Sequence, residues 1–175
     1  MKGKNEQGFT LIELLIVVAI ISIIAAIAVP GLLRARMTGN ETSAIASLKV
    51  TTSAQVAYVA SCGNGSYAAT YAILGTPPLG TTEAFISADL GHATPILKSG
   101  YDFDLIGGAG SVAGLNDCNG TATISAYYAT ADPQTYGTTG TRHFATNAGN
   151  TIWQNTADAA IPEPFAAAGT IAPVQ

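Results

Sequence analysis

The sequence predicts an α+β fold, in which one long N-terminal α-helix packs on a roughly four-stranded antiparallel sheet. Three observations predict this arrangement. Residues 9–29 are almost entirely apolar, residues 37–61 carry apolar side chains at helical spacing, and the clear strand patterns all follow residue 100. Because the helical part and the β-rich part are separate in the chain, they are expected to form separate layers of one fold.

The first half of the predicted helix has the composition of a membrane span. Residues 9–29 contain only three polar side chains, those of Thr10, Glu13 and Ser22. A helix of this length rises ~1.5 Å per residue and just spans a hydrocarbon core that is ~30 Å thick. We therefore assign residues 9–36 to a transmembrane half of the helix.

The second half of the predicted helix, residues 37–61, is amphipathic. Its apolar positions recur at spacings of three and four, which places them on one face of a helix. We expect this face to pack against the sheet, and its members are Ile45, Leu48, Thr52, Val56 and Val59.

Pro30 and Gly31 lie between the two halves of the helix. Proline has no N–H, so Pro30 cannot donate a hydrogen bond to the carbonyl of Ala26. Glycine weakens a helix by about 1 kcal/mol relative to alanine. The pair therefore predicts a helix kink, or a turn of helix that melts readily. A proline that the helix merely tolerates is the alternative.

Residues 62–175 are expected to form a globular head with antiparallel strands. Residues 101–107 alternate large apolar side chains with aspartate, and residues 121–131 are rich in β-formers. Residues 142–155 have the pattern of a hairpin that turns at residues 147–150. These runs together give about four strands.

The remaining parts of the head carry weaker signals. Residues 63–100 are interrupted by glycine and proline, and only a short helix near residues 82–90 is expected there. The tail from Ile161 onward is rich in proline and alanine. It is expected to be loose or draped on the surface, and an ordered edge segment is the alternative.

The charges of the chain are unevenly distributed. From Met37 onward there are three basic and nine acidic residues, a net charge of −6. A surface that binds phosphate groups needs clustered lysine or arginine. No direct nucleic-acid binding is therefore expected.

Catalytic and metal-binding patterns are weak. His92 and His143 are far apart in the sequence and do not have the spacing of metal ligands. Asp102 and Asp104 share one face of a predicted strand, but no acid-rich loop accompanies them, so calcium binding is not expected. The sequence predicts no catalytic residue, no metal site and no cofactor, and the chain is not expected to be an enzyme.

Two cysteines, Cys62 and Cys118, make an even count in a chain that begins with an export-type segment. Export places cysteines in an oxidising compartment, where pairing is favoured. The pattern predicts a disulfide that ties the end of the long helix to the β-rich part. Two buried free thiols are the alternative.

The N-terminal segment fits three interpretations. An ordinary signal peptide would use Lys2 and Lys4 as its basic start and would be cut after Ala28, which releases a soluble domain. A simple transmembrane anchor would place Glu13 near one membrane surface. Neither interpretation uses the Gly8–Phe9 junction.

The third interpretation comes from the stretch KNEQGFTLIELLIVVAIISIIAAIAVP, which resembles the class III signal of type IV pilins and pilin-like proteins. The resemblance implies a leader of residues 1–8 that prepilin peptidase cuts between Gly8 and Phe9, and N-methylation of Phe9. It also implies that Glu13 pairs with the new amino group of a neighbouring subunit during assembly. Thr10 and Glu13 fit a local capping box as well, and both roles are compatible.

The resemblance further implies where the protein acts and with which partners. The precursor would lie in the inner membrane with its head in the periplasm, and identical or related pilin subunits would then form a helical homopolymer outside the cell. A pilus assembly platform and ATPases would act indirectly, and the filament would serve adhesion, twitching motility or DNA uptake. Apart from the resemblance, we expect Arg34 and Arg36 to lie at the phosphate headgroups before assembly, and we hypothesise that they meet acidic side chains of neighbouring subunits in a filament.

Two further functions remain as alternatives at the level of sequence. One is a pseudopilin of a type II secretion system, which shares the N-terminal signal. The other is a soluble exported binding domain that ordinary signal peptidase releases.

Overall fold

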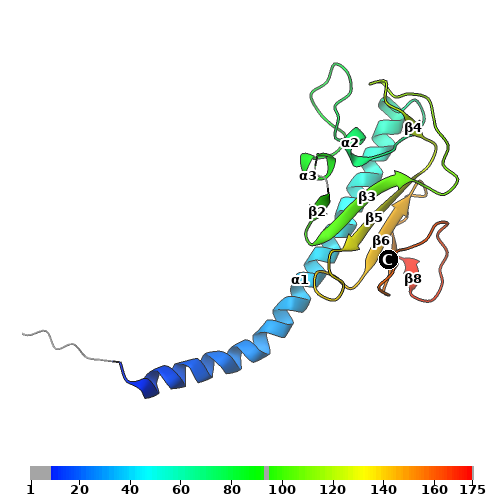
Figure 1. Cartoon of the computed structure of the whole chain (residues 1–175). Coiled ribbons are helices and arrows are strands. Elements are labelled where there is room, and N and C mark those ends of the chain that lie inside the picture. Colours follow the sequence, from blue (N-terminus) through cyan, green and yellow to red (C-terminus); the bar gives the residue numbers. More distant parts are fainter. Residues whose placement is uncertain (1–8, 93–94, 175) are drawn as a thin grey trace, which may run out of the picture. The chain divides into compact units, whose positions relative to one another are not determined.

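The computed structural model describes residues 9–92 and 95–174, and the chain divides into two units between Arg36 and Met37. Helix α1 (Leu11–Ser61) belongs to both units. In the second unit, the strands of a sheet lie alongside residues 37–61 of this helix (Figure 1). The helix ends where the sequence predicts, because Cys62 and Gly63 both donate their N–H to the Tyr58 carbonyl and turn the chain away.

The head contains a six-stranded and a two-stranded antiparallel sheet, which confirms the α+β prediction. The strands of the larger sheet, in spatial order, are β2 (Ile96–Lys98), β3 (Tyr101–Gly107), β5 (Tyr127–Pro133), β6 (His143–Asn147), β7 (Trp153–Asn155) and β8 (Ile171–Pro173). The smaller sheet pairs β1 (Tyr67–Ala68) with β4 (Thr123–Ile124). Two short helices, α2 (Tyr71–Leu74) and α3 (Ala88–Gly91), precede β2.

The four central strands are those the sequence predicts, with one correction. Strand β3 and the β6–β7 hairpin fall at the expected places, and the Asn150 N–H closes the hairpin turn on the Asn147 carbonyl. The run at residues 121–131 is not one strand. Its first part, β4, pairs with β1, and the chain then crosses to the larger sheet as β5.

The expectation of a loose tail is wrong. Strand β8 pairs with β7 and closes the edge of the sheet, and the Val174 N–H donates to the Ile152 carbonyl at 2.8 Å. The Ile161 side chain is buried and its carbonyl accepts from the Tyr128 hydroxyl. Backbone hydrogen bonds, which leave no periodic trace in the sequence, therefore order this segment.

The prediction of which face of α1 is buried is also wrong. Val56 is 52 % exposed, and Leu48 is the only fully buried member of the predicted stripe. The buried face is rotated and mixes small, polar and aromatic side chains. Its members are Glu41, Ala44, Ser47, Leu48, Thr51, Ala54, Gln55 and Tyr58.

Hydrogen bonds explain why a polar face is buried. The Gln55 amide donates to the Ala68 carbonyl and accepts from the Ala68 N–H, both at 2.9 Å, and so pairs with β1 as a neighbouring strand would. The Tyr58 hydroxyl donates to Asp117 at 2.8 Å. Burial and this carboxylate raise the pKa of Tyr58. Such partners satisfy groups that would be costly to bury alone.

The predicted disulfide joins Cys62 to Cys118, with a Cα–Cα distance of 4.8 Å. The Cys118 N–H also donates to the Cys62 carbonyl at 2.9 Å. The disulfide connects the end of α1 to the loop that precedes β4. The two half-cystines are 56 residues apart, so the bond closes a long loop of the unfolded chain.

Replacing Cys62 and Cys118 together with serine is expected to lower the free energy of unfolding of the head by roughly 2–5 kcal/mol, because the unfolded chain regains the freedom of that loop. Urea unfolding of the full chain in detergent measures the change. Wild-type protein treated with reductant is the control and should unfold at the same midpoint as the variant. An unchanged midpoint in the variant contradicts the prediction.

Candidate assembly site

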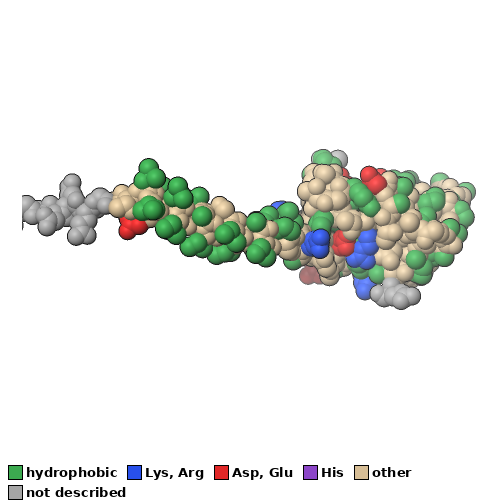
Figure 2. Space-filling model, turned by 90° about the horizontal axis from the view of Figure 1, so that it is seen from below, with side chains coloured by type: hydrophobic (Ala, Val, Ile, Leu, Met, Phe, Trp, Pro, Cys, Tyr) green, Lys and Arg blue, Asp and Glu red, His purple; other side chains and the backbone are tan. Residues whose placement is uncertain are grey.

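The apolar segment, residues 9–36, is exposed along its whole length in the single subunit. Its large apolar side chains are 48–81 % exposed, and they cover much of the face of the segment seen in Figure 2. Helix α1 contains a stretch that is long and apolar enough to cross a membrane. An apolar surface of this extent marks contact with lipid or with other protein chains.

Thr10 and Glu13 begin the helix with a reciprocal capping box. The Thr10 N–H donates to Glu13 Oε2 at 2.9 Å, and the Glu13 N–H donates to Thr10 Oγ1 at 3.3 Å. These bonds satisfy backbone groups that a helix start leaves unpaired. On the Glu13 carboxylate, the capping box uses Oε2 alone, and no hydrogen bond from the described part of the chain reaches Oε1.

The other predicted site residues of this segment are placed as follows. Gly8 and the leader of residues 1–8 lie outside the described residues. Phe9 is 77 % exposed. Pro30 and Gly31 lie within α1, which remains helical through both residues, so the kink stays a prediction. A side chain at Gly31 would meet no atom within 4 Å, so packing in the single subunit does not require glycine there.

Sequence reasoning missed one buried carboxylate, Glu41 of α1, which holds the helix to the sheet. Its Oε1 accepts from the Thr141 N–H at 2.8 Å and from the Thr141 hydroxyl at 2.9 Å. Its Oε2 accepts from Nε and Nη2 of Arg142 at 2.9 and 2.6 Å. The position of Glu41 seven residues before Leu48, on the same helix face, is the sequence signal that points to it.

Electrostatics keep Glu41 ionised. Burial by itself raises the pKa of this carboxyl, but the hydrogen bonds from Thr141 and the Arg142 guanidinium outweigh it. The pKa of Glu41 therefore lies below the ordinary carboxyl value. Arg142 also donates from Nη1 to Gln154 at 2.8 Å, so the ion pair connects α1 to β7 as well.

The described residues contain no group of three or more His, Cys, Asp or Glu side chains that could hold a metal ion. His143, on β6, is buried with its Nδ1 2.6 Å from Asp132 Oδ1. Its Nε2 lies 3.4 Å from Asp158. The first contact joins β6 to β5, and the second places Asp158, from the segment after β7, beside the other ring nitrogen.

Comparison with known proteins identifies relatives of this chain and a family motif in its N-terminal apolar segment. The family model described as the prokaryotic N-terminal methylation motif matches residues 3–29. The chain is 41 % identical over 91 residues to the type IV wide pilus major component PilA4 of Thermus thermophilus, a match that covers 52 % of this chain and 68 % of that protein.

A second relative is the type IV major pilin protein PilA of Myxococcus xanthus. It is 46 % identical over 56 residues, which are 32 % of this chain and 26 % of that protein. No solved structure matches the chain. The extent of the Thermus match, the methylation motif and the exposed apolar helix together establish that the chain belongs to the type IV pilin family, with a class III signal, and is a subunit of a type IV pilus.

Proposed function

We propose that prepilin peptidase cuts this chain between Gly8 and Phe9, and that the new Phe9 amino group is N-methylated. The observation that carries this proposal is the methylation motif, whose match to residues 3–29 spans the junction. The exposure of Phe9 and the helix start at Leu11 support it, because the cut then falls just outside a regular helix.

Glu13 pairs with the amino group of a neighbouring subunit in this proposal. Cleavage creates a positive charge in apolar surroundings, where an unpaired ion is costly. The capping box occupies Oε2 of Glu13 and leaves Oε1 without a donor among the residues described. The same carboxylate can therefore cap its own helix and bind a second group.

The proposed organisation follows the division of the chain. Residues 1–8 are the leader, residues 9–36 insert in the inner membrane and later form the filament core, and residues 37–61 carry the head of residues 62–175. The head faces the periplasm before assembly. The subunit then leaves the membrane for a filament at the cell surface, and most apolar contacts with lipid are exchanged for apolar contacts with neighbouring helices.

The role of the subunit in this proposal is structural and not enzymatic. An assembly platform and separate ATPases drive polymerisation, and the filament serves adhesion, twitching motility or DNA uptake. Direct binding of nucleic acid by the head is not part of the proposal, because residues 37–175 carry a net charge of −6.

A Gly8→Val variant tests the processing step. We expect the full precursor to accumulate in the membrane without shortening, and no filaments to be sheared from the cells, because a branched side chain at the cut site obstructs the peptidase. Gly3→Val, within the leader but away from the junction, is the control and should be processed normally. Normal shortening of the Gly8 variant overturns the proposed cleavage site.

Pro30→Ala together with Gly31→Ala tests the proposed weak turn of the helix. Helix propensities predict a gain of roughly 4 kcal/mol in local helix stability. Hydrogen exchange in assembled filaments should therefore become slower at residues 26–31. Gly39→Ala, another helical glycine in open space, is the control and should leave exchange at residues 26–31 unchanged. Equal exchange in both variants contradicts a weak turn at Pro30.

A further inference from the structure

A cavity of about 630 Å³ lies at the edge of β3, beside α2 and β2, and we name it the β3-edge cavity. Strand β2 pairs with β3 only from Tyr101 to Phe103. Strand β2 begins at Ile96, so among the described residues no strand pairs with this edge of β3 beyond Phe103. The cavity is therefore open to a partner that approaches the edge.

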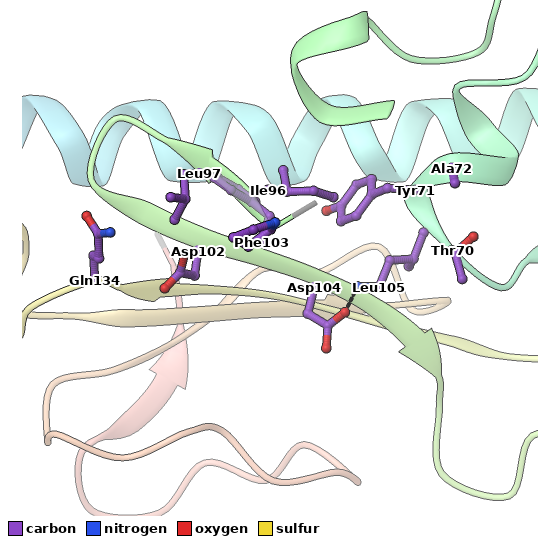
Figure 3. Close-up of a pocket in the computed structure, with 11 residues that line it drawn as sticks. Thr70, Tyr71, Ala72, Ile96, Leu97, Asp102, Phe103, Asp104, Leu105 and Gln134 are labelled. Carbon is purple, nitrogen blue, oxygen red and sulfur yellow. Dashed lines mark hydrogen bonds between the residues drawn. The ribbon is translucent and has the colours of Figure 1, made fainter. Parts of the chain in front are cut away.

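The lining combines apolar surface with two carboxylates. Tyr71 and Leu105 line it from the core side and are nearly fully buried, so the accessible apolar side chain is Leu97, which is 48 % exposed and pairs opposite Asp102. Asp102 and Asp104 project from the same side of β3, as Figure 3 shows, and both are exposed. Residues two apart on a strand are ~7 Å apart, so one cationic group can lie near both carboxylates. This lining fits a cation attached to an apolar surface.

The two carboxylates have no basic partner among the described residues of the head. Asp102 stands opposite Asp132 in the ladder, where like charges repel. Asp132 is engaged by His143, but no side chain within residues 9–92 and 95–174 hydrogen-bonds to or pairs with Asp102. Of the described donors, Asp104 accepts only from the N–H of Leu105, at 2.9 Å. A cation bound from outside would relieve this repulsion.

The apolar segment carries a surface with the complementary chemistry. Residues three and four apart on a helix are neighbours, so Arg36 shares one face with Leu32 and Leu33. We name these three residues the Arg36 face. All three are exposed, Leu32 by 69 % and Leu33 by 50 %. Arg34 is two residues from Arg36 and points to a different side of the helix.

We propose that the Arg36 face of one subunit docks into the β3-edge cavity of a neighbouring copy, where the Arg36 guanidinium binds Asp102 and Asp104. Leucine side chains of the Arg36 face then pack against Leu97, and a guanidinium donates to carboxylates in a paired geometry. The net charge of −6 on residues 37–175 attracts the arginine over a longer range. This docking rests on assembly of the chain into filaments and assigns a defined contact within them.

Substitutions that exchange the charges of the two sides test this contact. They are made in cells that assemble filaments from the wild-type chain. Asp102→Arg with Asp104→Arg is expected to reduce the yield of sheared filaments about tenfold or more, and Arg36→Glu is expected to do the same. Combining all three changes should restore filaments. Immunoblots of the membrane fraction should show equal amounts of subunit throughout, because every altered side chain is exposed.

Arg34→Glu is the matched control, since it makes the same change of charge on another side of the helix. Arg34→Glu should not restore filaments when it is combined with Asp102→Arg and Asp104→Arg. Equal rescue by Arg34→Glu, or full piliation of the Arg36→Glu variant, overturns the docking. Wild-type cells are included in the same experiment. If they form filaments, the chain acts as a pilin, and a negative result then counts against the docking alone.

Cysteine cross-linking tests the contact without relying on the charge variants. One chain carries Asp102→Cys, a second carries Arg36→Cys, and both are expressed together. Oxidation of their filaments should yield a covalent dimer that is absent when Arg34→Cys replaces Arg36→Cys. The native Cys62–Cys118 bond leaves no other free thiol in the described chain. Filaments that assemble but give no dimer overturn the docking.

Discussion

Replacing Glu41 with glutamine is expected to lower the free energy of unfolding of the head by about 3 kcal/mol. Removing one partner of a buried ion pair costs roughly 3–5 kcal/mol. The lower end applies here, because the Arg142 side chain keeps 30 % exposure and retains its hydrogen bond to Gln154. Urea unfolding of the full chain in detergent measures the effect.

The matched control is Asp89→Asn, which breaks the ion pair with Lys98. The N–O distance of that pair, 2.7 Å, is close to the 2.6 Å between Arg142 and Glu41, but its two side chains are 49 % and 32 % exposed. Pairs of this kind contribute about 0–1 kcal/mol. Equal losses in the two variants would contradict the view that Glu41 anchors the helix to the sheet.

The Glu41 contribution also depends on pH. The pKa of Glu41 is lowered in the folded state, so the unfolded state binds the proton first as the pH falls. The stabilisation is therefore fully present above the unfolded carboxyl pKa and is lost as the pH falls through the folded pKa. The difference in unfolding midpoint between wild type and Glu41→Gln should shrink from about pH 6 toward pH 3. A difference that is constant with pH contradicts this linkage.

Replacing Glu13 with glutamine is expected to abolish filaments while leaving cleavage and subunit levels unchanged. The variant cannot neutralise the amino group of a neighbouring Phe9, and an unpaired ion in apolar surroundings costs several kcal/mol. A loss of about 3 kcal/mol at each contact corresponds to a reduction of roughly a hundredfold in assembly. Sheared filaments and membrane-bound mature subunit are quantified by immunoblot.

Thr10→Ala separates assembly from capping. This variant loses the hydroxyl of the capping box but keeps the carboxylate, so only about 1 kcal/mol of helix stability is lost. Filaments should persist. If Thr10→Ala removes filaments as completely as Glu13→Gln does, the carboxylate acts by capping its own helix, and its proposed pairing with a neighbour is wrong.

The parts of the fold that the sequence predicts are those whose cause is local. Strand β3 alternates buried aromatic or aliphatic residues with exposed aspartates, so its pattern has period two. The end of α1 follows from the turn residues after Ser61, where Asn64 and Gly65 have positive φ. The N-terminal motif is also contiguous, and for that reason the family resemblance was visible in the sequence.

The parts that could not be predicted depend on partners far along the chain. Gln55 and Tyr58 are buried because Ala68 and Asp117 receive their hydrogen bonds, and hydrophobic periodicity contains no information about these partners. Glu41 meets Arg142, which is about a hundred residues away. The β3-edge cavity lies where β2, which begins at Ile96, pairs with β3 no further than Phe103, so only the folded chain brings its lining together.

The central claim is that this chain is processed at Gly8–Phe9 and then polymerised through its apolar helix. Intact mass and N-terminal sequence of the protein from sheared native filaments test that claim most directly. We expect a chain that begins with N-methylated Phe9. A mature chain that begins at Val29 would contradict the claim, because it would lack Glu13 and most of the apolar segment.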